Sequence, residues 1–161
     1  MDRLSSREIG LAVLRWGGDI LRSPGMEKEK RYLQHGKVTV YRHSLSVACL
    51  SLYLERRFRV PVEERALVRG ALLHDYFLYD WHVREPSHRW HGFRHAGFAL
   101  RNASRDFQLG PIERDIIRKH MFPLNLALPR YRESALVSLA DKLCAAGETI
   151  NLPRPGWNLA I

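Results

Sequence analysis

Four residues that can bind a metal ion stand where the surrounding sequence is apolar. They are His43, His74, Asp75 and Asp141. An ionised carboxylate such as Asp141, placed within an apolar helix, costs several kcal/mol unless a cation or hydrogen bonds compensate. His74 and Asp75 also need a compensating partner, because they follow an apolar run, 71–73, that should still be packed in the core. A divalent cation would compensate all of these groups, since imidazole and carboxylate together suit Mn, Fe, Zn, Ni or Mg.

The positions of these residues require three helices to converge on one point. His43 is expected near the start of one helix, the His74-Asp75 pair at the end of a second, and Asp141 within a third. Neighbouring residues point about 100° apart on a helix, so His74 and Asp75 can share one metal only near a helix end.

Helical periodicity predicts the elements that must position these side chains. Apolar residues recur in steps of three and four, and proline, glycine and capping residues mark the ends. The first helix should break at Gly17-Gly18, and the second should stop at Gly36. No strand pattern is evident, so the fold class is all-α, a single compact bundle of about five to seven helices. The expected helices cover residues 5–17, 26–34, 40–57, 61–75, 93–102, 111–122 and the chain from 135 onward.

Two segments are expected to lie outside these helices. Residues 79–90 are aromatic, polar and rich in His and Arg, and Pro86 argues against a continuous helix there, so they form the candidate functional loop. Residues 151–161 are predicted to be an irregular C-terminal extension. The 161 residues otherwise suit one domain, 1–161, since domains usually hold roughly 100–200 residues.

The composition indicates an ordinary globular protein with an excess of positive charge. Hydrophobic residues make up 45% and charged residues 27%, and the formal net charge is +9. The charge favours anionic partners such as phosphoesters, nucleotides, nucleic acid or acidic lipid, although Lys and Arg are spread along the chain. Cys49 and Cys144 are expected to be reduced core residues. No apolar run approaches the ~20 residues that span a bilayer, so a cytoplasmic location without a membrane partner is expected.

Three short motifs in order resemble the HD-domain superfamily of metal-dependent phosphohydrolases. They are the segments 41–48 (YRHSLSVA), 71–75 (ALLHD) and 139–142 (LADK). The resemblance covers roughly residues 38–148, and it implies an HD-like helical core in which His43, His74, Asp75 and Asp141 hold one metal. The chain departs from many members at Tyr76-Phe77, where they have a small residue, Gly and Lys, and it lacks a Gly-Tyr-Pro signature.

The resemblance is closest to small members with a binuclear metal site. It implies that His95 and His120 hold a second metal, with Asp75 bridging the two and acting as the catalytic carboxylate. The implied cofactors are two divalent ions, drawn from Fe, Mn, Ni, Co, Zn and Mg. The implied reaction is hydrolysis of a phosphomonoester or phosphodiester, in a nucleotide or similar small phosphorylated metabolite, by a metal-activated water.

Four basic residues beside the expected ligands are candidates for binding the substrate phosphate. They are Arg94, Arg118, Lys119 and Lys142. The roles of two further histidines stay open: His91 lies four residues before His95 and could take its place, and His35 could reach the same pocket.

Three other functions remain open at this point. Some relatives with a di-iron site oxidise a carbon of their substrate with dioxygen, and the same scaffold could do so here. A second alternative is a module that senses or binds a nucleotide without turnover. A third is nucleic-acid binding driven by the charge, with Trp81, Trp90 and Phe93 near Arg89 and Arg94. The oligomeric state is also open.

Overall fold

Seven α-helices and one two-stranded sheet make up the described part of the chain in the computed structural model, which covers residues 6–83, 86 and 91–150. The all-α prediction is therefore confirmed. The helices are α1 (Ser6–Leu21), α2 (Pro24–Glu29), α3 (Val40–Phe58), α4 (Glu64–Leu73), α5 (His91–Asp106), α6 (Pro111–Lys119) and α7 (Arg132–Thr149), and the strands are β1 (Leu33–His35) and β2 (Val38–Thr39). The expected cap at Ser5 and the C-terminal extension 151–161 lie outside the described residues.

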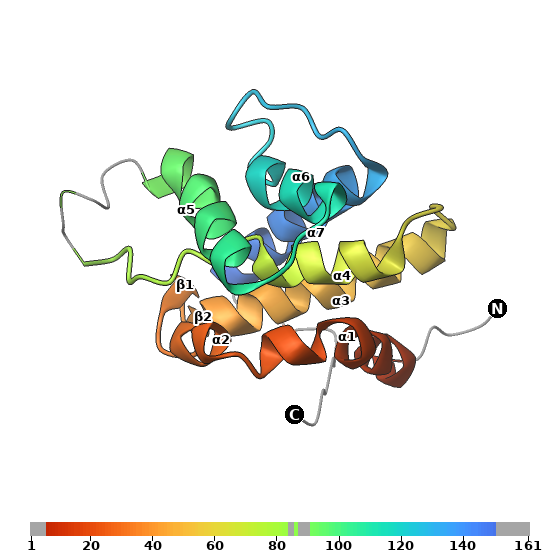
Figure 1. Cartoon of the computed structure of the whole chain (residues 1–161), viewed down its shortest axis with the longest axis horizontal. Helices are drawn as coiled ribbons and strands as arrows, with labels where there is room; N and C mark the ends of the chain where they lie inside the picture. Colours follow the sequence, from red (N-terminus) through yellow and green to blue (C-terminus); the bar gives the residue numbers. More distant parts are fainter. Residues whose placement is uncertain (1–5, 84–85, 87–90, 151–161) are drawn as a thin grey trace.

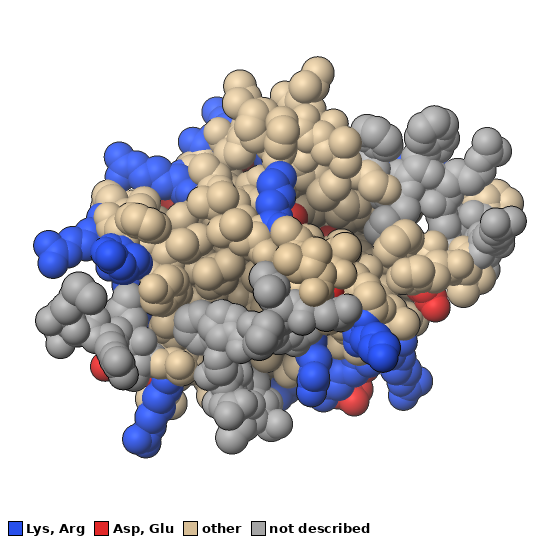
Figure 2. Space-filling view, turned by 180° about the vertical axis from the view of Figure 1, so that it is seen from behind, with Lys and Arg blue, Asp and Glu red and all other residues tan. Residues whose placement is uncertain are grey.

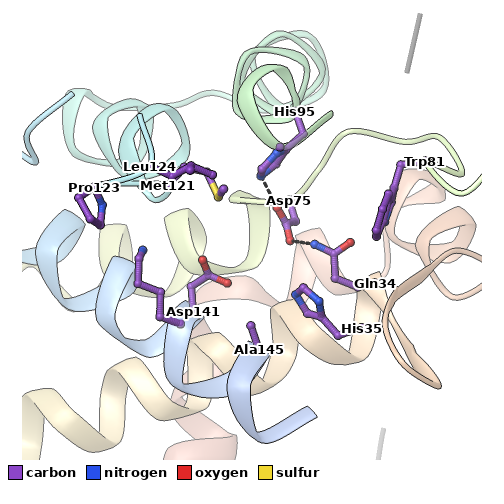
Figure 3. A pocket seen from close by; sticks show the side chains of 12 residues that line it. Gln34, His35, Asp75, Trp81, His95, Met121, Pro123, Leu124, Asp141 and Ala145 are labelled. Atoms are coloured by element: carbon purple, nitrogen blue, oxygen red, sulfur yellow. Dashed lines mark hydrogen bonds and ion pairs between the residues drawn. The ribbon is translucent and has the colours of Figure 1, made fainter. Parts of the chain in front are cut away.

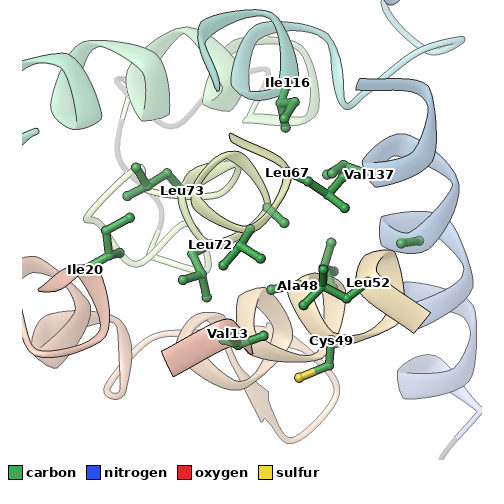
Figure 4. Packing of buried hydrophobic residues seen from close by; sticks show 14 of the residues in the cluster. Val13, Ile20, Ala48, Cys49, Leu52, Leu67, Leu72, Leu73, Ile116 and Val137 are labelled. Atoms are coloured by element: carbon green, nitrogen blue, oxygen red, sulfur yellow. The ribbon is translucent and has the colours of Figure 1, made fainter. Parts of the chain in front are cut away.

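Helix α4 is the central element of the bundle. It packs against α1, α3, α5, α6 and α7, and in Figure 1 it lies beside α3, with α1 below the pair and α6 above. Every residue from 66 to 73 is buried, so the helix has no solvent-facing side along this stretch. Figure 4 looks along α4 and shows Leu67, Leu72 and Leu73 pointing toward different neighbouring helices. The end of α4, which carries His74 and Asp75, is thereby held inside the molecule.

The predicted break at Gly17-Gly18 is wrong, because α1 continues through both glycines to Leu21. Both are buried in the helix, and a Cβ added at Gly17 would collide with the side chain of Leu72. Glycine here allows α1 to approach α4 closely rather than ending the helix.

The predicted bounds 26–34 of the second helix are also wrong, and two short strands that no sequence pattern indicated follow it. Helix α2 ends at Glu29, and β1 then pairs antiparallel with β2, with Leu33 opposite Thr39. Gly36 makes the tight connection with a φ of 57°, a conformation that favours glycine. Strands of three and two residues are too short to show an alternating pattern, which is why the sequence did not reveal them.

Local residues set the starts of two helices whose other ends reach the site. Glu63 caps α4, and its carboxylate accepts hydrogen bonds from the backbone N–H groups of Arg65 and Ala66. Pro111 begins α6, where its missing N–H costs nothing. After α6, the segment 120–131 leads back to α7, and the Phe122–Pro123 peptide bond within it is cis.

The surface charge is dispersed on the face seen in Figure 2. Lys and Arg side chains stand in separate groups around this face, with uncharged surface between them. Among the helices that the structure describes, none has the length and apolar character needed to cross a membrane. Cys49 is buried, which raises the pKa of its thiol to about 12, and Cys144 is half-buried; neither is in a disulfide.

Candidate metal centre

Six residues from five helices or their ends meet beside the buried end of α4. The structure brings together all six residues that the sequence suggested as metal ligands. Each has less than a tenth of its surface exposed. They are His43 of α3, His74 and Asp75 after α4, His95 of α5, His120 after α6 and Asp141 of α7.

His43, His74, Asp75 and Asp141 form one side of this cluster. His43 Nε2 lies 3.0 Å from Asp141 Oδ1 and 3.7 Å from Asp75 Oδ2. His74 Nε2 lies 3.4 Å from Asp75 Oδ2 and 3.6 Å from Asp141 Oδ1. Two imidazole nitrogens thus face two carboxylate oxygens around one small space.

His95, His120 and the other oxygen of Asp75 form the second side. The two Nε2 atoms of His95 and His120 are 2.9 Å apart, and they lie 3.2 and 3.5 Å from Asp75 Oδ1. The carboxylate of Asp75 therefore lies between the two groups of imidazoles and presents one oxygen to each.

Backbone carbonyls orient two of the imidazoles. His74 Nδ1 is 2.7 Å from the carbonyl oxygen of Ala71, and His120 Nδ1 is 2.8 Å from that of Ile117. A carbonyl oxygen can only accept a hydrogen bond, so each Nδ1 carries a proton. In the neutral ring the lone pair is then on Nε2, the atom that faces the centre, which is the arrangement that metal-binding histidines adopt.

Glu148 orients the third imidazole and was missed from the sequence. Its Oε2 accepts from His43 Nδ1 at 2.8 Å, and both side chains are buried. Glu148 lies seven residues after Asp141, two turns further along α7, so both are on the same helix face. That spacing from a suspected ligand is the signal that could have suggested it.

Gln34 of β1 was missed as well. Its Nε2 donates to Asp75 Oδ2 in a short hydrogen bond, although 41 residues separate the two. Gln34 is buried, and the amide steadies the carboxylate that lies between the two imidazole groups. No local pattern in the sequence marks it, because it lies on a three-residue strand.

The electrostatics of the cluster fit a cation. Burial alone would lower the pKa of His43, but the hydrogen bonds with Asp141 and Glu148 outweigh it and raise the pKa to about 9. Burial alone would raise the pKa of Asp141, but the imidazoles of His43 and His74 hold it below its usual value. These opposing shifts show that the buried carboxylates favour positive charge beside them, which a metal ion would supply.

Unsatisfied polar atoms point the same way. Among the residues that the structure describes, His74 Nε2 and Asp75 Oδ1 are buried and have charged neighbours at 3.2–3.6 Å, but neither atom forms a hydrogen bond of normal geometry. Buried polar atoms are normally paired, and a divalent cation would pair both of these. The donor set of imidazole nitrogens and carboxylate oxygens therefore fits a bound metal.

A cavity of about 580 Å³ opens onto the cluster (Figure 3). Asp75, His95 and Asp141 reach it from the metal centre, and Trp81, from the candidate functional loop, stands at its edge. The other residues that line it are Gln34, His35, Gly92, Met121, Pro123, Leu124, Lys142 and Ala145.

Of the four basic residues considered for phosphate binding, Lys142 lines this cavity. Its ammonium donates to the backbone oxygens of His120 at 2.9 Å and Ser138 at 3.1 Å, and to Ser138 Oγ at 2.8 Å. These bonds tie the end of α6 to α7 and thereby fix His120.

The structure does not bring the other three basic residues to the cavity lining. Lys119 forms an ion pair with Asp115 at 2.7 Å, one turn earlier on α6. Arg94 is exposed, with its guanidinium 5.6 Å from the ring centre of Phe98, and Arg118 is exposed.

The two histidines with open roles differ in position. His35 lines the cavity, with its ring centre 5.1 Å from that of His43, and its ligand atoms group with those of His43 and Glu148. The side chain of His91 and most of the segment 84–90, including Trp90 and Arg89, lie outside what the structure describes.

The family model of the HD domain matches residues 40–146. This chain belongs to the HD-domain family. HD-domain proteins are generally metal-dependent hydrolases, and the His and Asp cluster of this chain fits such a metal site. The HD-domain match includes all six clustered residues, whereas Gln34 and Glu148 lie outside it. Neither the curated proteins nor the solved structures contain a significant match to the chain.

Proposed function

We propose that this HD-domain protein hydrolyses phosphomonoesters or phosphodiesters of small phosphorylated metabolites, such as nucleotides, with two divalent cations. The observation that carries the proposal is the position of Asp75. Its two carboxylate oxygens face two separate groups of imidazole nitrogens, 3.4 Å from His74 on one side and 3.2 Å from His95 on the other. A carboxylate in this position suits a pair of metal ions.

We assign His43, His74, Asp75 and Asp141 to one ion, and Asp75, His95 and His120 to the other. In support, the ligand atoms of His43, His74 and Asp75 lie within 4.8 Å of one another, and so do those of Asp75, His95 and His120. Fe, Mn, Ni, Co, Zn and Mg all accept such ligands to different degrees. When bound, divalent ions lower the pKa of water and stabilise the negative charge that develops on phosphoryl oxygens.

The protein's own residues orient these groups and limit access to them. Gln34 holds Asp75, and Glu148 and two backbone carbonyls hold the imidazole rings. The cluster is buried on the protein side and meets solvent through the cavity, whose size is typical of sites for small molecules. A small anionic metabolite can therefore place its phosphate against the cluster, which favours such a substrate over nucleic acid.

Metal analysis combined with phosphate release tests the proposal. Purified protein is stripped of metal, reloaded separately with each candidate ion, and assayed for bound metal, for phosphate release from nucleotides and other phosphomonoesters, and for the alcohol and phosphomonoester products of phosphodiesters. Asp75→Ala should lower turnover roughly a hundredfold or more, since charge stabilisation by bound metals contributes several kcal/mol. Glu27→Ala is the matched control, because it removes a carboxylate that is 64% exposed on α2.

Two results would contradict the proposal. One is protein that binds none of the candidate ions. The other is metal-loaded protein that cleaves no monoester or diester in the panel, which would favour oxidation by a di-iron site or nucleotide sensing instead.

A further inference from the structure

The cavity beside the metal centre has carboxylates at its centre and apolar residues on two sides. Asp75 and Asp141 lie in the middle of the view in Figure 3, next to the imidazoles. Trp81 stands on one side of them and an apolar wall on the other. This wall consists of Met121, Pro123 and Leu124.

The apolar wall is attached directly to the metal centre. It begins one residue after His120, and the backbone N–H of Leu124 donates to the carbonyl oxygen of Met121 at 2.8 Å, which closes a turn. Leu124 is 52% exposed, so half of its side chain is turned away from the protein core. On the opposite side, the ring of Trp81 stacks on that of His82, with the ring centres 3.9 Å apart.

We infer that the substrate carries an apolar group, preferably an aromatic ring, that sits between Trp81 and the apolar wall while its phosphoester faces the metals. This inference rests on the proposed function. An aromatic ring gains free energy when it leaves water for such a site, and a second aromatic side chain adds a favourable ring contact.

A sugar-like or highly charged group would bind less well against this wall. Hydroxyl groups and charges lose their hydrogen bonds to water there and need partners in the protein to replace them. Within the described part of the lining, Lys142 is the only Lys or Arg side chain, and its ammonium already donates to three oxygen atoms. The wall itself offers apolar side chains.

The test compares two phosphomonoesters of similar chemical reactivity. 2-Phenylethyl phosphate and glycerol 3-phosphate are both esters of primary alcohols, so differences in leaving group contribute little. The metal-loaded protein should show a kcat/KM roughly tenfold or more higher for 2-phenylethyl phosphate, because burying one aromatic side chain is worth at least that factor. Equal values for the two esters would overturn the inference.

Variants in the two sides of the cavity localise the effect. Leu124→Ser and Trp81→Ala should remove most of the preference, mainly through KM, by lowering kcat/KM for 2-phenylethyl phosphate more than for glycerol 3-phosphate. Trp81→Phe should retain it. Leu126→Ser is the matched control, because Leu126 belongs to the same segment, is 89% exposed and does not line the cavity. A preference that survives both Leu124→Ser and Trp81→Ala would contradict the assignment of the wall.

Binding of a phosphonate separates this inference from the proposed function. 2-Phenylethylphosphonate and ethylphosphonate cannot be hydrolysed, and calorimetry with Mn²⁺-loaded protein measures their affinities directly. If no ester is hydrolysed, the proposed function fails, yet tighter binding of 2-phenylethylphosphonate that depends on Trp81 and Leu124 would still support the apolar site. Equal affinities would overturn it.

Discussion

The carboxylate of Glu148 accepts a hydrogen bond from His43 Nδ1 at 2.8 Å, deep inside the protein. This contact joins two helices across 105 residues of sequence, and it directs His43 Nε2 toward Asp141. The geometry matches a carboxylate that fixes the tautomer and orientation of a metal-binding histidine.

Removing this carboxylate should weaken metal binding. We expect Glu148→Ala to lower the affinity for the first metal by about 10–100-fold, the usual effect of losing a group that orients a ligand. Glu148→Gln should recover part of the affinity, because its amide oxygen still accepts from Nδ1. Competition with a chelator measures both affinities, and Glu27→Ala serves as the exposed control. Unchanged affinity in Glu148→Ala would show that His43 needs no such partner.

The second group of imidazoles should control how many metals are bound. His95 and His120 face Asp75 Oδ1 at 3.2 and 3.5 Å, so replacing either by Ala should reduce the bound metal from two ions per chain toward one. Elemental analysis of dialysed protein measures this ratio. His82→Ala is the control, since His82 is 47% exposed and outside the cluster. An unchanged ratio in both site variants would refute the assignment of a second ion to these residues.

Metal affinity should fall as the pH falls. The pKa of His43 is raised to about 9, so below that pH the metal-free site holds a proton that a cation must displace. The affinity should therefore rise with pH up to about 9 and then level off. The slope should be about tenfold per pH unit for each proton released. Mn²⁺ titrations across this range give the slope.

A variant tests the cause of this pH dependence. Asp141→Asn removes a carboxylate that raises the pKa of His43. The pH above which the metal affinity no longer rises should therefore be lower in this variant. An affinity for the unaltered protein that does not change with pH would mean that no proton is displaced from the site.

The close approach of α1 and α4 predicts a difference between two glycines. Gly17→Ala should lower the free energy of unfolding by about 1–3 kcal/mol, because its Cβ would collide with Leu72 in a packed core. Gly97→Ala should instead raise it by about 0.5–1 kcal/mol, since Gly97 is exposed within α5 and an added Cβ there meets nothing within 4 Å. Denaturant unfolding of metal-free protein measures both values. Equal effects would refute the role assigned to Gly17.

Sequence patterns were sufficient for most of the helices, and together with the family resemblance they pointed to the six clustered residues. Apolar residues at helical spacing predicted most of the elements, and a carboxylate such as Asp141 within an apolar helix required a positive partner. The signals for the helices are local in the sequence. The signal for the clustered residues depends on the order of the motifs that resemble the HD-domain family. Both could therefore be seen before any contact between helices was known.

Only the tertiary structure revealed which other residues support the cluster. Gln34 reaches Asp75 from a three-residue strand, and Glu148 reaches His43 from the far end of α7. The path of α1 through Gly17 likewise depends on the position of Leu72 in another helix. In each case the deciding contact joins residues 41 or more positions apart.

The apolar wall of the cavity and Trp81 opposite it were also decided by tertiary structure. Trp81 and Leu124 lie in irregular segments without periodicity, so their sequence context does not indicate which way they face. Lys142 follows the proposed ligand Asp141 in the sequence, yet its ammonium donates to the backbone oxygen of His120 after α6. Periodicity predicts which face of a helix is buried. The direction of a loop side chain and the partner of a charge depend on what the rest of the fold places beside them.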